Sequence, residues 1–227
     1  VVPNRDGSAT HEPPHPLLAK GKVRFVGDAV AVVIAESLQQ AKSASELIEV
    51  DYDELPAVVN LETAASGAEI HEGMAENRYF DWELGDEAAT DTALKSASRV
   101  VKLKVRNNRL VPNPMEPRAA LAEYDDLNDS YTLYTTSQSP HLTRLVLAAF
   151  MFQIPESKIR VVAPDVGGGF GAKIYVYVEE AVCTWASKKI KRPIKWTADR
   201  TQAFLTDAHG RDHINNVQLA LDSNNKI

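Results

Sequence analysis

The stretch Val166-Gly167-Gly168-Gly169-Phe170-Gly171-Ala172-Lys173 decides how this sequence is interpreted, because it gathers four of the chain's eleven glycines. Apolar periodicity predicts a strand over 158–163 before it and a helix over 175–190 after it. Glycine lets main-chain N–H groups approach a ligand without a Cβ atom in the way, and a helix N-terminus nearby would favour oxyanions. The stretch therefore predicts an anion-binding loop, or else a tight strand-to-helix connection without a ligand.

A dinucleotide-binding loop is one interpretation of this stretch. The fingerprint G-x-G-x-x-[GA] is matched by Gly167, Gly169 and Ala172. Asp199, at the end of the next predicted strand, would then hydrogen-bond a ribose. Against this, Pro164-Asp165 separates the predicted strand from the first glycine, whereas in the fingerprint the strand runs directly into it. A Walker-type phosphate loop is excluded, because Lys173 is followed by Ile174 and not by Ser or Thr.

The composition is that of a soluble globular protein, with 44% hydrophobic and 25% charged residues among 227. The net charge is −6 and no block of basic residues occurs, which disfavours a nucleic-acid partner. The longest apolar runs, 29–35 and 145–152, are far too short to span a membrane. Cys183 is the only cysteine, so no intrachain disulfide can form, and a cytoplasmic location is expected.

The first part of the chain predicts a compact β-β-α-β unit over 21–60. Two apolar runs flank Gly27-Asp28, which is a hairpin signal, and Ser37 with Gln40 forms a capping box that starts a helix. A strand over 48–52 follows. The acidic segment 61–92 has no steady period and is interpreted as a linker.

The second part of the chain predicts mixed strands and helices. Alternation predicts a half-buried strand over 100–106 and a hairpin from 119–124 and 131–138. Ser139-Pro140 predicts a helix start. Besides those flanking the glycine stretch, further strands are predicted over 193–198 and 213–221.

Several polar residues have both a structural and a functional interpretation. Gln138 precedes the helix start, where its amide could donate to an oxo group or simply cap the turn. A loop with three prolines presents Glu116 and Arg118, either to a ligand or to one another as an ion pair. His209 and His213 have the spacing of zinc ligands, but Gly stands where a zinc protease has Glu, which disfavours a zinc site. Cys183 is expected to be a buried small hydrophobe.

Six segments occur in an order typical of one enzyme family and cover nearly the whole chain. They are 27–33 (GDAVAVV), 48–56 (IEVDYDELP), 113–118 (NPMEPR), 137–138 (SQ), 166–171 (VGGGFG) and 211–213 (RDH). With them the sequence resembles the large, molybdenum-binding subunit of the xanthine dehydrogenase/aldehyde oxidase family, and most closely its bacterial carbon-monoxide-dehydrogenase-like branch.

The resemblance implies an α+β fold made of two domains. These are an α/β hammerhead domain over 1–62, shortened at its N-terminus, and, after a linker over 63–92, the beginning of a mixed α/β molybdopterin-binding domain over 93–227. We therefore expect the chain to be a piece of a longer polypeptide.

The resemblance also implies a molybdenum–molybdopterin cofactor, possibly in its cytosine dinucleotide form, with no direct protein ligand to the metal. Gln138 would donate its amide toward an oxo ligand. The loop residues Gly168, Gly169, Phe170 and Gly171 would hold the oxo-metal group through main-chain N–H groups, since preorganised donors stabilise anionic oxygens. The reaction would hydroxylate a carbon centre of an aldehyde, an N-heterocycle or carbon monoxide with oxygen derived from water.

Electrons would leave through iron–sulfur clusters and a flavin, held by a 2Fe–2S small subunit and an FAD-binding medium subunit in a dimer of heterotrimers. Ile174 stands where purine-hydroxylating members of the family carry glutamate, which disfavours a purine substrate. The catalytic glutamate and any active-site cysteine loop are expected beyond Ile227, so this stretch alone is expected to be inactive. Two alternatives stay open: a dinucleotide-dependent oxidoreductase, and an assembly module in which residues 1–60 dock onto a partner.

Overall fold

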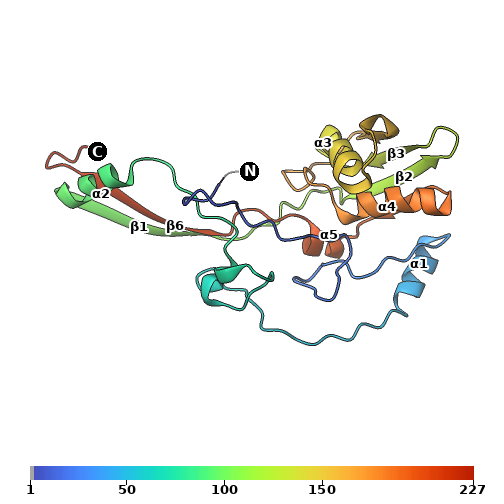
Figure 1. The fold of residues 1–227 in the computed structure, drawn as a ribbon, viewed down its shortest axis with the longest axis horizontal. Coiled ribbons are helices and arrows are strands. Elements are labelled where there is room, and N and C mark those ends of the chain that lie inside the picture. The colour runs from blue at the N-terminus through green and yellow to red at the C-terminus, as the bar shows by residue number, and fades with distance from the viewer. Residues whose placement is uncertain (1–2) are drawn as a thin grey trace. The chain divides into compact units, whose positions relative to one another are not determined.

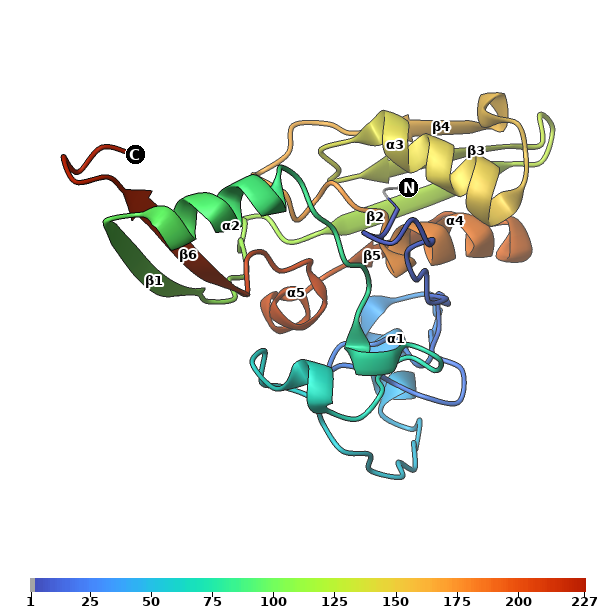
Figure 2. The same ribbon diagram turned by 60° about the vertical axis from the view of Figure 1, so that its left-hand side comes forward.

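A computed structural model describes residues 3–227, which divide into two compact units that are discontinuous in sequence. We call them the strand-pair unit and the sheet unit. The strand-pair unit comprises 3–15, 53–110 and 211–227, and the sheet unit comprises 16–52 and 111–210. Both are drawn in Figure 1 and, turned, in Figure 2.

The sheet unit is built on a mixed sheet with strand order β4-β3-β2-β5. Its strands are β2 (Ala119–Asp125), β3 (Ser130–Thr135), β4 (Ile159–Val162) and β5 (Ile194–Thr197). β2 pairs antiparallel with β3 and with β5, while β3 pairs parallel with β4. The sequence predicted a strand at each of these places, over 119–124, 131–138, 158–163 and 193–198.

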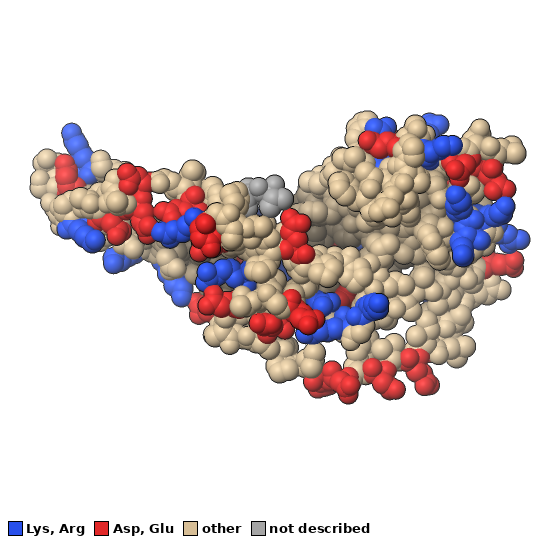
Figure 3. Space-filling view, viewed as in Figure 1, with Lys and Arg blue, Asp and Glu red and all other residues tan. Residues whose placement is uncertain are grey.

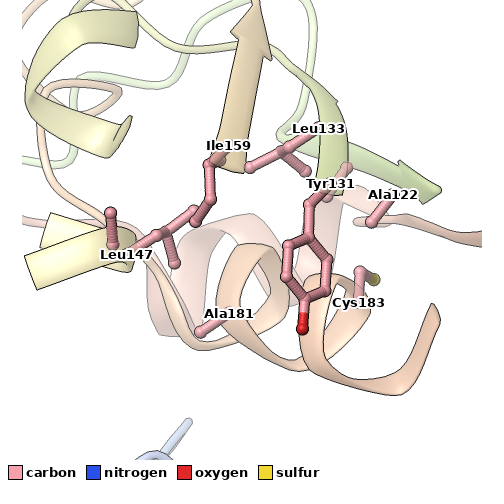
Figure 4. Packing of buried hydrophobic residues seen from close by; sticks show 9 residues of the cluster. Ala122, Tyr131, Leu133, Leu147, Ile159, Ala181 and Cys183 are labelled. Carbon is pink, nitrogen blue, oxygen red and sulfur yellow. The ribbon is translucent and has the colours of Figure 1, made fainter. Parts of the chain in front are cut away.

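Helices cover one face of this sheet, as Figure 2 shows. They are α3 (Pro140–Leu145), which continues into the π-helical segment η3 (Val146–Phe152), and α4 (Val178–Ile190). Residues from these helices pack against residues from β2, β3 and β4 in one hydrophobic core, which Figure 4 shows from close by. The buried residues of this core are Ala120, Ala122, Tyr131, Leu133, Leu147, Ala148, Ile159, Ala181 and Cys183. Cys183 is buried as expected. The short 3₁₀ turn η4 (Glu156–Lys158) leads into β4, and α5 (Arg200–Thr206) follows β5.

The prediction of a β-β-α-β unit over 21–60 is correct for the helix and wrong for the strands. α1 (Leu38–Ser45) begins where the capping box placed it, with the Ser37 hydroxyl accepting from the Gln40 N–H. No strand occurs among these residues, although the turn before Asp28 forms. A hydrogen-bond ladder does not extend from that turn. Beyond the turn itself, the main-chain hydrogen bond that links its two sides in the described chain is Ala19 N–H to Ala29 C=O, 2.6 Å.

In the strand-pair unit, β1 (Arg99–Asn107) and β6 (His213–Leu221) form an antiparallel pair, side by side in Figure 1. Both strands were predicted, but the apolar side of β1 is exposed and not half-buried. The segment interpreted as a linker carries the 3₁₀ turns η1 (Ala64–Ser66) and η2 (Ala75–Asn77) and most of α2 (Glu87–Ser96), whose N-cap is Asp86. Sequence periodicity did not reveal α2, because it buries no residue.

On the face shown in Figure 3, basic and acidic side chains are intermixed. Within residues 3–227, no helix has the length and apolar character that crossing a membrane requires.

Candidate functional site

The glycine loop, residues 166–173, follows β4 in the sheet unit, but it does not open the next helix. α4 begins only at Val178, with Tyr177 as its N-cap residue. The Tyr177 N–H donates to the Glu180 carboxylate at 2.9 Å, so a side chain of the helix itself caps this terminus. The expectation that a helix N-terminus would add positive potential at the loop is therefore wrong. Any ligand held here relies on loop amides and nearby side chains.

The start of the loop is held by Glu116, which the proline-rich loop presents. Its Oε2 accepts the Gly167 N–H at 2.7 Å and the Lys173 ammonium at 2.9 Å. Burial acts to raise the pKa of Glu116, but the hydrogen bonds from Lys173 and Gly167 outweigh it and hold that pKa below its usual value. The approach is close: a Cβ atom on Gly167 would lie 2.6 Å from the Cβ atom of Glu116.

The end of the loop is held by Gln138. Its Oε1 accepts the Gly171 N–H at 2.9 Å and the Lys173 N–H at 3.3 Å, and its own main-chain N–H donates to the Lys173 carbonyl at 2.8 Å. Oε1 of Gln138 faces the loop, and its amide NH2 group, Nε2, has no acceptor within residues 3–227. The side-chain N–H groups of Gln138 are therefore unused by the described residues.

Two loop amides are free as well. The N–H groups of Gly169 and Phe170 have no acceptor in the part of the chain that the structure describes. The Gly171 N–H, by contrast, is engaged by Gln138, so it is not a free donor as the sequence interpretation assumed. The Phe170 side chain is 74% exposed and its φ is +51°. The loop therefore offers a cluster of unused N–H donors beside an exposed aromatic ring.

The part of the chain that carries this loop matches a known protein family. Residues 70–227 match the family model of the molybdopterin cofactor-binding domain. The chain belongs to this family. Residues 2–56 match the α/β hammerhead domain of aldehyde oxidase and xanthine dehydrogenase. The α+β fold class expected from the sequence is confirmed.

Curated relatives and solved structures agree with this assignment. The carbon monoxide dehydrogenase large chain of Hydrogenophaga pseudoflava is 37% identical over 93% of this chain and 28% of its own length. The nicotine 6-hydroxylase large subunit of Paenarthrobacter nicotinovorans is 32% identical over 93% of this chain and 26% of its own length. Quinoline 2-oxidoreductase from Pseudomonas putida 86 superposes with a TM-score of 0.78 at 38% identity, over 91% of this chain and 26% of that structure. The chain therefore spans little more than a quarter of these proteins.

In this molybdopterin-binding domain, Glu116 and Arg118 do not pair with each other. Arg118 is buried and donates to Asp207 at 2.7 Å and to Glu179 at 2.8 Å, and its guanidinium carbon lies 3.6 Å from the centre of the Tyr177 ring. Burial acts to lower the pKa of Arg118, but these two carboxylates raise it above its usual value. Arg118 is therefore turned inward, where it holds Asp207 and Glu179 together.

The geometry does not meet the requirements of a dinucleotide site. β4 and β5 lie at opposite edges of the sheet with β3 and β2 between them, so they do not form the adjacent parallel pair that a βαβ unit needs. Asp199 accepts the Gln202 N–H at 2.8 Å as the N-cap of α5, so its carboxylate serves the helix.

The histidine pair gives no support to a metal site either. His209 contacts the carbonyl of Phe204, and His213 contacts the Asn107 amide. Within residues 3–227, no cluster of three or more His, Cys, Asp or Glu side chains is arranged to hold a metal ion.

Proposed function

We propose that this chain is part of the large subunit of a molybdenum hydroxylase, and that Gln138 and the glycine loop hold the oxo-bearing side of a molybdenum–molybdopterin cofactor. The observation that carries the proposal is the donor cluster: the Gln138 amine and the N–H groups of Gly169 and Phe170 are unused by residues 3–227. The relatives named above support it, because their names describe oxidation of carbon monoxide and nicotine.

The residues present fit such a group. Neutral N–H donors held in fixed positions suit an anionic oxygen, and here the loop is fastened at both ends before any ligand binds. A Cβ atom on Gly171 would meet nothing within 4 Å, so the space beside the loop is open. The nearby carboxylate of Glu116 is turned to Lys173 and Gly167, so it is not a free negative charge.

When bound, the cofactor would supply a two-electron redox centre with oxo ligands. The chain's own residues would bind and orient it: the Gln138 side-chain N–H groups and the Gly169 and Phe170 main-chain N–H groups would donate to its oxygens. The exposed Phe170 ring would exclude water from one side of the bound group. Gly168, with φ at +92°, supplies the turn that brings these N–H groups together.

The rest of the proposal concerns the whole enzyme. Its substrate would be an aldehyde, an N-heterocycle or carbon monoxide, with purines disfavoured by Ile174. The base that activates water would come from sequence beyond Ile227. Electrons would pass to a 2Fe–2S small subunit and an FAD-binding medium subunit in a dimer of heterotrimers in the cytoplasm, and the pterin would be present in its cytosine dinucleotide form.

The experiment that tests the proposal is metal and cofactor analysis of the intact protein, produced with its neighbouring subunits in a host that makes the cofactor. We expect stoichiometric molybdenum and release of a cytosine nucleotide on acid hydrolysis. Gln138→Ala should lower the molybdenum content, whereas Gln153→Ala, at the exposed end of η3, should not. Absence of molybdenum from the wild-type protein would overturn the proposal.

A further inference from the structure

We infer that Glu116 and Lys173 are positioning residues, whose ion pair closes the two ends of the glycine loop and thereby fixes the direction of the Gln138 amide. Neither residue touches the ligand in this scheme. The inference rests on the proposed function for the identity of that ligand, but the coupling between the ion pair and Gln138 concerns this chain alone.

A single carboxylate oxygen joins both ends of the loop. Oε2 of Glu116 accepts the N–H of Gly167, the first loop glycine, at 2.7 Å. The same oxygen accepts the ammonium of Lys173, at the last loop position, at 2.9 Å. The five residues between these ends, 168–172, are therefore closed into a ring by one acceptor, and the loop cannot widen without breaking a hydrogen bond to a charged group.

The lysine end of this clamp has little freedom. The Lys173 side chain is 0% exposed, and Glu116 is the carboxylate that pairs with it. A buried ammonium that loses its carboxylate strongly destabilises the folded chain. The ion pair therefore favours the closed loop over conformations in which Lys173 and Glu116 separate. The same burial shows that Lys173 is directed into the protein and does not extend from the loop toward a phosphate.

The segment that carries Glu116 is itself held in place by Arg200. The guanidinium of Arg200 donates to the Met115 carbonyl at 2.7 Å and to Oδ1 of Asn113 at 2.5 Å. Pro114, between these two residues, is fully buried. Proline rigidity and these contacts fix the segment that carries Glu116, so that its carboxylate is presented to the loop in one position.

The main-chain N–H and carbonyl of Lys173 both hydrogen-bond to Gln138, so the position of Lys173 affects that of the Gln138 side chain. The Lys173 N–H donates to Oε1 of Gln138 at 3.3 Å, while the Lys173 carbonyl accepts the Gln138 N–H at 2.8 Å. Which way a glutamine amide faces is set by its hydrogen bonds. The Gly171 N–H also donates to Oε1, at 2.9 Å. A shift of Lys173 would therefore remove one of the two donors that keep Oε1 inward and loosen the direction of the Nε2 amide group.

The test is hydrogen exchange of the loop amides in the intact subunit made without cofactor, combined with molybdenum content and kcat in the loaded enzyme. Glu116→Gln keeps the shape and an acceptor but leaves the buried ammonium uncompensated. We expect it to speed exchange of the Gly171 and Lys173 amides about ten- to hundredfold, and to lower kcat more than it raises KM. Asp126→Asn is the matched control, because it breaks an exposed ion pair with Lys191 in the same unit.

The double variant Glu116→Gln/Lys173→Met separates positioning from simple stability. Removing both charges should restore the thermal midpoint of unfolding toward wild type, whereas Gly171 and Lys173 exchange and kcat should stay impaired. Full recovery of exchange protection in the double variant would overturn the inference, as would unchanged exchange in Glu116→Gln or an equal effect in Asp126→Asn. A wild-type enzyme without molybdenum would overturn the proposed function instead, while the exchange rates would still decide the coupling.

Discussion

A Cβ atom on Gly169 would lie 2.2 Å from Oε1 of Gln138, so the glutamine side chain itself requires glycine at this position. The requirement is one of space, because the φ of Gly169 lies outside the left-handed region. Gly168 and Gly171 differ, since each has a φ of +92°. The loop therefore needs some glycines for their backbone conformation and another for the close approach of Gln138.

Gly169→Ala should displace the Gln138 side chain while leaving the chain folded, because the atoms that clash belong to the flexible end of that side chain. The Gly171 and Lys173 amides then lose their acceptor, which is expected to lower the free energy of unfolding by about 1–3 kcal/mol. Urea unfolding followed by tryptophan fluorescence measures this, and molybdenum content of the intact enzyme should fall in parallel.

Gly210→Ala is the control for this substitution. A Cβ atom there would meet nothing within 4 Å, and Gly210 has no positive φ, so its replacement is expected to be neutral or to stabilise by about 0.4–1 kcal/mol. The variants Gln138→Ala and Gly169→Ala should be non-additive, because both remove the same hydrogen bonds. Additive losses would mean that the clash is relieved by something other than Gln138.

The sheet unit could be predicted from sequence because its strands are buried on one side. In β3 the buried Tyr131 and Leu133 alternate with the polar residues Ser130 and Thr132, and that period is visible without a structure. The segments around Gly27 carry equally apolar residues but form no strand pairing in residues 3–227. Apolar alternation predicts which side a strand would bury, and it does not reveal whether a partner strand lies beside it.

The candidate site was predictable only in part for a related reason. A run of glycines is a local signal, so the loop could be singled out from the sequence directly, whereas the role expected of Gln138 came from the family resemblance. The Glu116–Lys173 and Arg118–Asp207 pairs join residues 57 and 89 positions apart. No spacing rule connects such residues, and a fully buried lysine looks like any surface lysine in a sequence. The proline-rich loop gave the only signal, namely that its charged residues would be held rigidly.

Arg118→Met should be the most destabilising substitution near the site. It removes the donor that Asp207 and Glu179 share and leaves two acidic groups without their cation, one of them buried. Breaking such a buried pair costs about 3–5 kcal/mol. The stacking of Arg118 on Tyr177 is lost as well. Urea unfolding near neutral pH measures the change, and Trp196, next to this network, is a convenient fluorophore.

Arg192→Met provides the comparison for Arg118. Arg192 pairs with Glu36 at 3.2 Å, but both side chains are largely exposed. Exposed pairs contribute about 0–1 kcal/mol, so this variant is expected to stay close to wild type. Comparable losses in both variants would show that the network around Arg118 is solvated and not a buried anchor.

Cys183 should make the free energy of unfolding fall as the pH rises above about 9. Burial in α4, together with the nearby charges of Glu179 and Glu180, raises the pKa of its thiol from about 9 to about 12. The pKa of the thiol is higher in the folded chain than in the unfolded chain, so its contribution to the free energy of unfolding is fully present below about pH 9. It is lost as pH rises toward about 12, because the unfolded thiol releases its proton there and the folded thiol does not.

Replacing Cys183 by alanine should abolish this dependence while leaving other alkaline titrations in place. The difference in unfolding free energy between wild type and Cys183→Ala is therefore expected to be constant below pH 9 and to shrink above it. A thiol reagent should also label the native chain slowly at pH 8 and the urea-unfolded chain rapidly, since the thiolate is the reactive form. Rapid labelling of the native chain would contradict the buried position of Cys183 in the core beneath the sheet.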